Sequence, residues 1–183
     1  MYKSLVAILL IIVSFIVVSC SPQVGQLQSY VNQQQGYGFF YPNGWIPVDV
    51  KNASEGVDAV FRDFIERSEN LSVIISPVEK NQRLEDLGSA SDVGYHFLRR
   101  LNDDPNVKRD VELLQADLLE NKGKTYYILE YQVQMPNKPP RHELANVTIN
   151  NGKLYTFSLS TPQRRWEQVK NIFYSVANSF FVY

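Results

Sequence analysis

The chain has 183 residues, the length of one ordinary domain. Its 18 Lys and Arg residues nearly balance its 19 Asp and Glu residues, and the resulting net charge of −1 argues against a dedicated nucleic-acid binder. With 44% hydrophobic and 20% charged residues, the composition is that of a globular protein. The single Cys excludes an intrachain disulfide and a thiolate metal cluster, and the two histidines, His96 and His142, leave little room for histidine-based catalysis.

The N-terminal segment has the pattern of an export signal. Lys3 precedes an almost entirely apolar run over residues 5–18, which is shorter than a membrane-spanning helix needs to be. The run ends in Val17-Val18-Ser19-Cys20, which resembles the bacterial lipobox, where the Cys thiol accepts a lipid. We predict a lipoprotein signal peptide over residues 1–19 and a lipidated Cys20 that holds the protein on a membrane surface. The alternatives are an uncleaved anchor and an ordinary signal peptide with a coincidental Cys.

The segment that follows is predicted to be a flexible tether. After Cys20 the sequence is rich in Gln up to Gln35, with scattered Ser, Asn and Gly, and it sustains no apolar period of either kind. The lipidated Cys and tether are therefore assigned to residues 20–35, and the folded domain is expected to span residues 36–183.

Strands are expected first in the domain, over residues 38–41, 45–48, 59–64 and 71–78. A helix follows, since Ser89 and Asp92 have the spacing of a capping box. Its apolar stripe at helical spacing consists of Val93, Phe97, Leu98 and Leu101. The sequence Asn102-Asp103-Asp104-Pro105 is expected to end it.

Two β-hairpins are expected next. The first joins residues 111–119 to residues 125–135, and the second strand of this pair alternates regularly between two faces. The second hairpin joins residues 144–150 to residues 154–160 across Asn151-Gly152, the strongest short hairpin signal. One face of this hairpin is expected to carry Ala145, Val147, Ile149, Tyr155, Phe157 and Leu159.

A final helix is expected to start at Thr161-Pro162, a capping residue followed by Pro at the first helical position. Its apolar face consists of Trp166, Val169, Phe173 and Val176. Residues 180–183 are apolar again and are expected to form a short edge strand or a docked tail. Because strands joined by tight hairpins are antiparallel, the chain is predicted to be an α+β domain, an antiparallel β-sheet flanked by helices.

His142-Glu143 is the candidate metal site, because a His and a carboxylate at a strand edge are ligands for a divalent ion. Adjacent strand residues point to opposite faces, so a second ligand would have to come from elsewhere in the fold. The alternative is an exposed residue at the entry of a strand. His96 is expected to be a solvated helical residue.

Two arginine doublets, Arg99-Arg100 and Arg164-Arg165, lie in the predicted helices. Each indicates either a solvated face or a contact with an acidic partner. No Gly-x-Ser-x-Gly, His-Glu-x-x-His or phosphate-binding Gly-rich loop occurs in the sequence, so an enzyme is not expected.

Seven segments in order resemble the PsbP family, the lumenal extrinsic proteins of photosystem II. They cover residues 36–183 and are Gly36-Tyr37-Gly38-Phe39 with Tyr41-Pro42-x-x-Trp45, Asn70-Leu71-Ser72-Val73-Ile74-Ile75-Ser76-Pro77, Asp86-Leu87-Gly88-Ser89, Tyr126-Tyr127-x-Leu129-Glu130-Tyr131, Arg141-His142-x-Leu144-Ala145, Asn151-Gly152-Lys153-Leu154-Tyr155 and Arg164-Arg165-Trp166. The lipobox points to the cyanobacterial branch, because the plant proteins are imported with transit peptides.

The resemblance implies an α-β-α sandwich of the PsbP/Mog1 type, a place on the lumenal face of the thylakoid membrane, and a role in assembly or stability of the oxygen-evolving complex. Photosystem II subunits or assembly intermediates are the implied partners, with Arg164 and Arg165 as candidate contacts. Plant members help to retain calcium and chloride, but they use a basic N-terminal segment where this chain has its Gln-rich stretch.

His142 matches the histidine proposed as a metal ligand in the family. The acidic residue expected before the basic pair corresponds here to Gln163, a poorer ligand. A divalent ion (zinc, calcium or manganese) at His142 therefore stays a secondary expectation. The rival hypotheses are a metal- or small-ligand-binding lipoprotein without a direct photosystem role, and a lipid-anchored enzyme.

Overall fold

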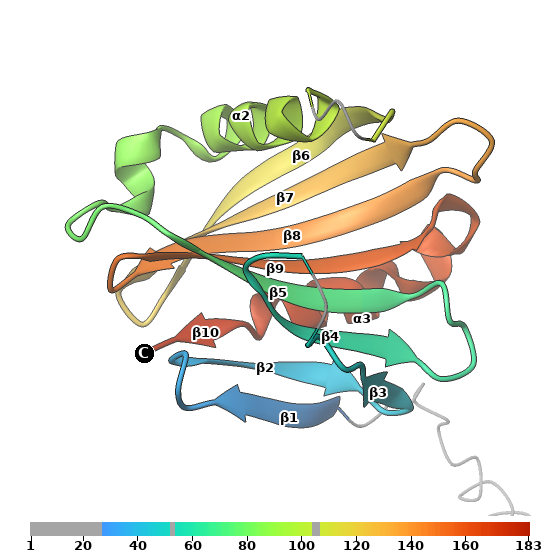
Figure 1. Ribbon diagram of the computed structural model, residues 1–183, viewed down its shortest axis with the longest axis horizontal. Helices are drawn as coiled ribbons and strands as arrows, with labels where there is room; N and C mark the ends of the chain where they lie inside the picture. The colour runs from blue at the N-terminus through green and yellow to red at the C-terminus, as the bar shows by residue number, and fades with distance from the viewer. Residues whose placement is uncertain (1–26, 52–53, 104–106) are drawn as a thin grey trace, which may run out of the picture.

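The computed structural model describes residues 27–51, 54–103 and 107–183, and these form two antiparallel sheets with helices (Figure 1). A seven-stranded sheet has the order β3-β4-β5-β9-β8-β7-β6, and a three-stranded sheet has the order β1-β2-β10. The strands are β1 Leu27–Asn32, β2 Tyr37–Pro42, β3 Trp45–Pro47, β4 Val57–Asp63, β5 Asn70–Pro77, β6 Asp110–Asn121, β7 Lys124–Gln134, β8 Arg141–Asn150, β9 Lys153–Pro162 and β10 Phe181–Val182. The helical elements are η1 Leu84–Leu87, α2 Ala90–Asn102, η2 Gln163–Arg165 and α3 Trp166–Asn178.

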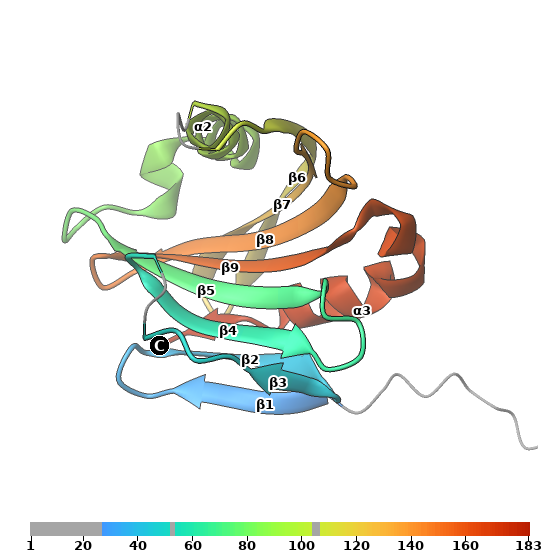
Figure 2. The same ribbon diagram turned by 45° about the vertical axis from the view of Figure 1, so that its right-hand side comes forward.

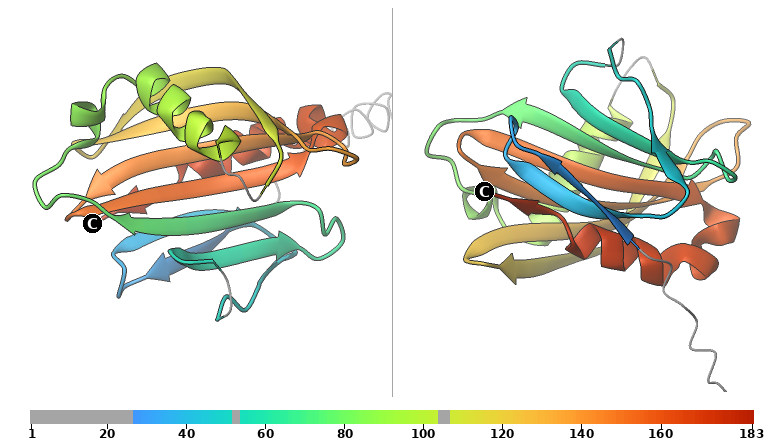
Figure 3. Two further views of the ribbon diagram at one scale, coloured as in Figure 1. Left: turned by 45° about the horizontal axis from the view of Figure 1, so that its top comes forward. Right: turned by 90° about the horizontal axis from the view of Figure 1, so that it is seen from below.

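The two faces of the large sheet carry separate hydrophobic cores. Helix α2 packs on β6 and β7 over one face, while α3 and the small sheet cover the other (Figures 2 and 3). The alternation of β7 divides its side chains between the two cores: Tyr127, Leu129, Tyr131 and Val133 face α2, whereas Tyr126 and Ile128 face α3. The α+β prediction is confirmed, and the separate three-stranded sheet is an addition to it.

Helix α2 begins as its sequence predicts. The Asp92 amide donates to Ser89 Oγ at 3.3 Å, and the Ser89 amide donates to Asp92 Oδ2 at 3.0 Å. These hydrogen bonds satisfy donors that the first helical turn leaves free. The Ser89 hydroxyl also donates to Asp92 Oδ2 at 2.6 Å, and this bond, followed by the bond from the Ser89 amide, lowers the pKa of Asp92. None of the helices in the described part of the chain is long and apolar enough to cross a membrane.

The predicted tether is wrong from Leu27 onward, because residues 27–32 form strand β1. Strand β1 pairs antiparallel with β2, and the two are joined by a turn in which Asn32 Oδ1 accepts hydrogen bonds from the amides of Gln34 and Gln35. The Tyr30 ring lies 5.1 Å from that of Phe39, centroid to centroid. No residue of this edge strand is fully buried, and only Leu27 and Tyr30 pack against the core, so its sequence lacks the dense apolar alternation of a central strand.

The predicted start of the last helix is also wrong. Thr161 and Pro162 are the end of β9, where Pro162 pairs with Arg141 of β8, and α3 begins only at Trp166 after the η2 turn. The Thr161 hydroxyl is buried and donates to Glu69 Oε1 at 3.0 Å. The Thr161 side chain, which the sequence pattern predicts to cap a helix, instead forms a hydrogen bond to a residue distant in the sequence.

The expectation that the two strands of the β8–β9 hairpin place their odd-numbered apolar residues on the same face is wrong. Asn151 and Gly152 both have positive φ, so a two-residue turn pairs Asn150 with Lys153. This register places Ala145 opposite Ser158 and Val147 opposite Thr156 on the α2 face. Residues of the other parity, Tyr155, Phe157 and Leu159, point into the core beneath α3.

Candidate functional site around His142 and Arg165

His142 is the second residue of β8 and lies opposite Thr161 of β9. It is 2% exposed, so the alternative of an exposed residue at the strand entry is wrong. Its Nδ1 lies 2.9 Å from Gln163 Oε1 and its Nε2 lies 2.7 Å from Glu130 Oε1. The ring stacks on Trp166 with a centroid separation of 3.7 Å. These contacts tie the start of α3 to the sheet.

Glu130 connects the same cluster to the middle of α3. Its second carboxylate oxygen, Oε2, accepts a hydrogen bond from the Tyr174 hydroxyl. Burial of the phenol and this hydrogen bond to a carboxylate both raise the pKa of Tyr174, so the hydroxyl stays a donor. The sequence of β7 does not indicate this role, because Glu130 lies on the less apolar face of an alternating strand, where a solvent-exposed residue is expected.

The donor set around His142 does not fit a divalent ion as it stands. Both ring nitrogens and both Glu130 oxygens are engaged in hydrogen bonds, and Gln163 supplies a neutral amide oxygen. Within residues 27–51, 54–103 and 107–183, no group of three or more His, Cys, Asp or Glu side chains converges on a possible metal position. A zinc, calcium or manganese ion at His142 stays a prediction.

Glu143 points to the opposite face of the sheet and forms a second polar cluster. Its Oε1 lies 3.4 Å from Arg141 Nε and accepts a hydrogen bond from the Ser160 hydroxyl. Arg141 also donates to Ser160 Oγ at 2.8 Å and to the Ser68 carbonyl at 2.7 Å. Burial raises the pKa of the Glu143 carboxyl to about 7, although the hydrogen bond from Ser160 and the charge of Arg141 oppose that shift.

The raised pKa of Glu143 predicts that the protein loses stability as the pH rises from about 4.5 to about 7. In this window the folded chain binds a proton that the unfolded chain has released, so deprotonation favours unfolding. We expect the contribution to reach at most roughly 3 kcal/mol. Urea unfolding measured across this range checks the slope, and Glu143→Gln should flatten it. An unchanged slope in that variant would assign the pH dependence to another group.

Arg165 is half-buried and forms an ion pair within the domain. Its Nε lies 2.5 Å from Glu69 Oε1, the oxygen that also accepts the Thr161 hydroxyl, and 3.9 Å from Glu66 Oε2. Glu69 is only 3% exposed and precedes β5, so the pair joins η2 to the loop between β4 and β5. The hydrogen bond to Glu69 raises the pKa of the Arg165 guanidinium. Arg165 is therefore a structural residue, as the fold requires a cation beside this buried carboxylate.

Arg164, its neighbour, is exposed. Among the residues that the structure describes, no carboxylate forms an ion pair with it. Its charge is one of those that lower the pKa of Glu66, after the larger effects of Ser68 and Arg165. Arg165 is thus paired with a buried carboxylate, whereas Arg164 faces solvent. The sequence alone does not reveal this difference between two adjacent arginines.

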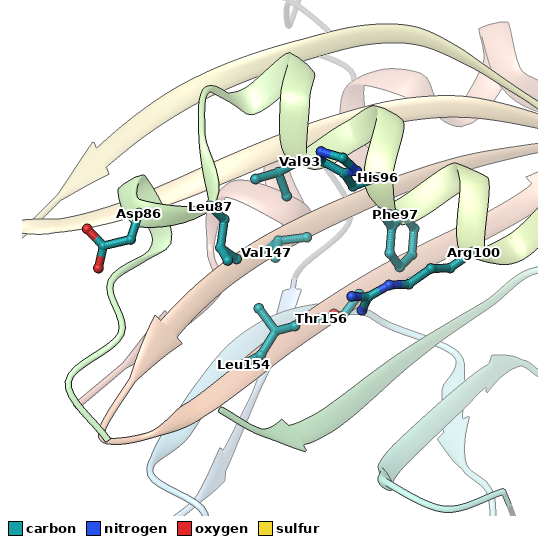
Figure 4. Close-up of a pocket in the computed structure, with 9 residues that line it drawn as sticks. All are labelled: Asp86, Leu87, Val93, His96, Phe97, Arg100, Val147, Leu154 and Thr156. Carbon is teal, nitrogen blue, oxygen red and sulfur yellow. The ribbon is translucent and has the colours of Figure 1, made fainter. Parts of the chain in front are cut away.

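The other doublet and His96 lie on α2. Arg99 forms an exposed ion pair with Asp103 at 3.5 Å. Arg100 and His96 are exposed at the rim of a hollow of about 370 Å³ between α2, η1 and strands β8 and β9 (Figure 4). Its walls are formed by Asp86, Leu87, Val93, Phe97, Val147, Leu154 and Thr156. Sequence patterns miss this hollow, because its lining comes from four separate elements.

Cys20 lies outside the described residues, so its predicted lipidation stays a prediction.

Comparisons with known proteins agree with this fold. The PsbP family profile matches residues 25–182. The protein named CyanoP from Synechocystis sp. (strain PCC 6803) is 50% identical over 179 residues, which are 97% of this chain and 95% of that protein. The solution structure of cyanobacterial PsbP (CyanoP) from Synechocystis sp. PCC 6803 has a TM-score of 0.75 at 52% identity, covering 91% of this chain and 99% of that one.

A more distant structure shares the fold alone. The Ran-binding protein Mog1p of Saccharomyces cerevisiae is 12% identical with a TM-score of 0.57, covering 86% of this chain and 96% of that one. The family match over residues 25–182 and the identity to CyanoP over almost the whole sequence lead to one assignment. This chain belongs to the PsbP family.

Proposed function

We propose that this protein is a lipid-anchored accessory protein of photosystem II on the lumenal side of the thylakoid membrane. There it assists the assembly or the stability of the oxygen-evolving complex. The observation that carries the proposal is the 50% identity to CyanoP over 97% of this chain. The lipobox at Cys20 supports the lipid anchor, because the only Cys of the chain stands at the end of the apolar leader.

The use of the polar groups supports an accessory role rather than an enzymatic one. The clusters around His142, Glu143 and Glu69 each join separate elements of the fold, and their charged atoms are paired with one another. A catalytic acid or base instead needs reach to a bound substrate. The protein is therefore proposed to act through its surface.

Affinity isolation of the full-length protein from detergent-solubilised thylakoid membranes tests this function. Assembly intermediates of photosystem II are separated from the mature complex, and the bound subunits are identified in each fraction. Enrichment of intermediates supports a role in assembly, and enrichment of the mature complex supports a role in stability. Recovery of no photosystem II subunit would contradict the proposal.

A small-ligand-binding lipoprotein is the second candidate, and the hollow beneath α2 is the observation that favours it. Its volume of about 370 Å³ falls within the range of small-molecule sites. The same isolation distinguishes the two candidates: a co-purified small molecule without photosystem II subunits would favour ligand binding.

Cys20→Ala is expected to abolish lipidation and to leave an unprocessed precursor or a form released from the membrane. The physical reason is that the thiol is the nucleophile that accepts the lipid, and the chain holds no other Cys. Mass spectrometry of the N-terminal peptide of the wild-type protein checks the prediction. An unmodified Cys20 there would rule out the anchor.

Arg164→Glu is expected to weaken binding to photosystem II by roughly 0.5–1 kcal/mol at low salt while leaving the fold intact. Arg164 is an exposed cation that stabilises no described ion pair, so an acidic partner is the interaction that its replacement would remove. Wild-type binding should itself weaken as salt is raised. Thermal melting provides the control, and equal binding of variant and wild type at low salt would exclude the contact.

A further inference from the structure

The loop between β4 and β5 presents two adjacent apolar side chains to solvent. Phe64 is 62% exposed and Ile65 is 92% exposed, the largest exposed fraction among the large hydrophobic residues of the described chain. Single exposed apolar residues are common on protein surfaces, but an adjacent pair at the tip of a loop is a different feature. Packing among the described residues leaves most of both side chains uncovered.

Hydrogen bonds fix the loop in this outward conformation. Asp63 Oδ1 accepts the amides of Ile65 at 2.7 Å and of Glu66 at 2.8 Å. The Phe64 amide donates to the Gly44 carbonyl at 3.0 Å, and the Glu69 amide donates to the Glu66 carbonyl at 2.8 Å. The two apolar side chains are therefore held away from the domain by a structured turn.

This loop lies at the end of the domain where strand β1 begins. Leu27, the first residue of β1, pairs with Pro42, two residues before the Gly44 that bonds Phe64. Figures 1 and 2 show the β4–β5 loop at the same end as the start of β1. A chain step spans at most about 3.6 Å, so the seven steps from Cys20 to Leu27 reach no more than about 25 Å.

The charges beside the loop suit a negatively charged membrane surface. Arg67 and Arg164 are exposed. Asp63 and Glu66, the acidic residues on either side of the apolar pair in the sequence, are engaged within the domain: Asp63 Oδ1 accepts the amides of Ile65 and Glu66, and Glu66 is contacted by the Ser68 hydroxyl and by Arg165. Glu69 is buried against Arg165. Exposed apolar side chains with exposed cations nearby are a combination that binds the interface of an anionic bilayer.

We propose that Phe64 and Ile65 insert into the interfacial region of the same membrane that holds the lipidated Cys20. The domain then rests on the bilayer through its β4–β5 loop, with the opposite end of the large sheet directed away from the membrane. This inference rests on the lipid anchor of the proposed function and adds the orientation of the domain.

The test uses the full acylated protein with a fluorescent thiol probe at Ile65→Cys. Acylation blocks Cys20, so the introduced thiol is the one that reacts. Leu118→Cys is the matched control, because Leu118 is a 58% exposed apolar residue on β6. Cross-strand pairing from Leu118 leads through Tyr127 and Val147 to the first residue of β4, whereas the loop follows the last residue of β4. Leu118 therefore lies away from the loop. Both proteins are reconstituted into vesicles of phosphatidylcholine and phosphatidylglycerol that contain a nitroxide lipid quencher.

We expect quenching of the probe at position 65 several times stronger than quenching at position 118. Equal quenching at the two positions overturns the proposal. A probe at position 65 that is shielded only when photosystem II is present, and not by vesicles alone, also overturns it and assigns the loop to a protein contact. Mass analysis of the same samples separates the two proposals: unmodified Cys20 refutes the anchor and the orientation together, whereas acylated Cys20 with an unquenched probe refutes the orientation alone.

Discussion

Replacement of Phe173 by Ala is expected to lower the free energy of unfolding by about 3–5 kcal/mol. Phe173 is 1% exposed in the middle of the apolar face of α3, and its ring packs edge-on against Trp45 and Trp166 with centroids 6.1 and 6.2 Å away. Removing the ring leaves a cavity between elements that are distant in sequence. Against a total stability of roughly 5–15 kcal/mol, this loss is severe.

Phe64→Ala is the matched control, because it removes the same side chain from a 62% exposed position. It should change stability by no more than about 0.5 kcal/mol. Denaturant unfolding followed by circular dichroism compares the two variants with the wild type. If Phe173→Ala unfolds at the same midpoint as Phe64→Ala, the apolar stripe of α3 does not form the core.

The elements that the sequence predicts correctly are those whose signal is local. The capping box of α2 requires only Ser89 and Asp92, and the two-residue turn at Asn151-Gly152 requires only positive φ at adjacent positions. The alternation of β7 predicts that Tyr127, Leu129 and Tyr131 share one buried face, and these side chains pack together beneath α2. In these cases the residues that carry the pattern also make the stabilising contacts.

The errors arise where a distant residue determines the local structure. Strand β1 forms because β2 offers it an edge, which the Gln-rich sequence around Leu27 does not indicate. Thr161 stays in a strand because it pairs with His142 of β8 and its hydroxyl donates to Glu69. Which residues of the β8–β9 hairpin face α3 depends on the register that the turn sets. A shift of that register by one residue exchanges the two faces of a strand.

The sequence identifies residues of the candidate site, but it does not reveal what each of these residues contacts. The family resemblance selects His142, Gln163, Arg164 and Arg165, and three of these four make specific contacts within the domain. Their partners Glu130 and Glu69 carry no motif, since each is a single acidic residue in a strand or loop. Burial of a lone carboxylate becomes visible only when the elements are assembled.

The buried carboxylate of Glu69 makes the loss of the Arg165 side chain strongly destabilising. Glu69 is 3% exposed, and its Oε1 depends on Arg165 Nε at 2.5 Å and on the Thr161 hydroxyl at 3.0 Å. A buried charge that loses its partner is destabilising by about 3–5 kcal/mol, because its desolvation is then no longer compensated by an ion pair. Arg165 is partly exposed, so water entering beside Glu69 should hold the loss near the lower end of that range.

Arg165→Ala is therefore expected to lower the free energy of unfolding by about 3 kcal/mol, whereas Arg164→Ala should change it by no more than about 0.5 kcal/mol. Urea unfolding of the two variants measures this difference between adjacent arginines. Adding Glu69→Gln to Arg165→Ala removes the stranded charge and should restore part of the lost stability, which a loss of Arg165 packing alone would not allow. Equal effects of the two Ala variants would mean that the ion pair with Glu69 does not stabilise the junction of η2 with the β4–β5 loop, and that the doublet acts as one solvated surface.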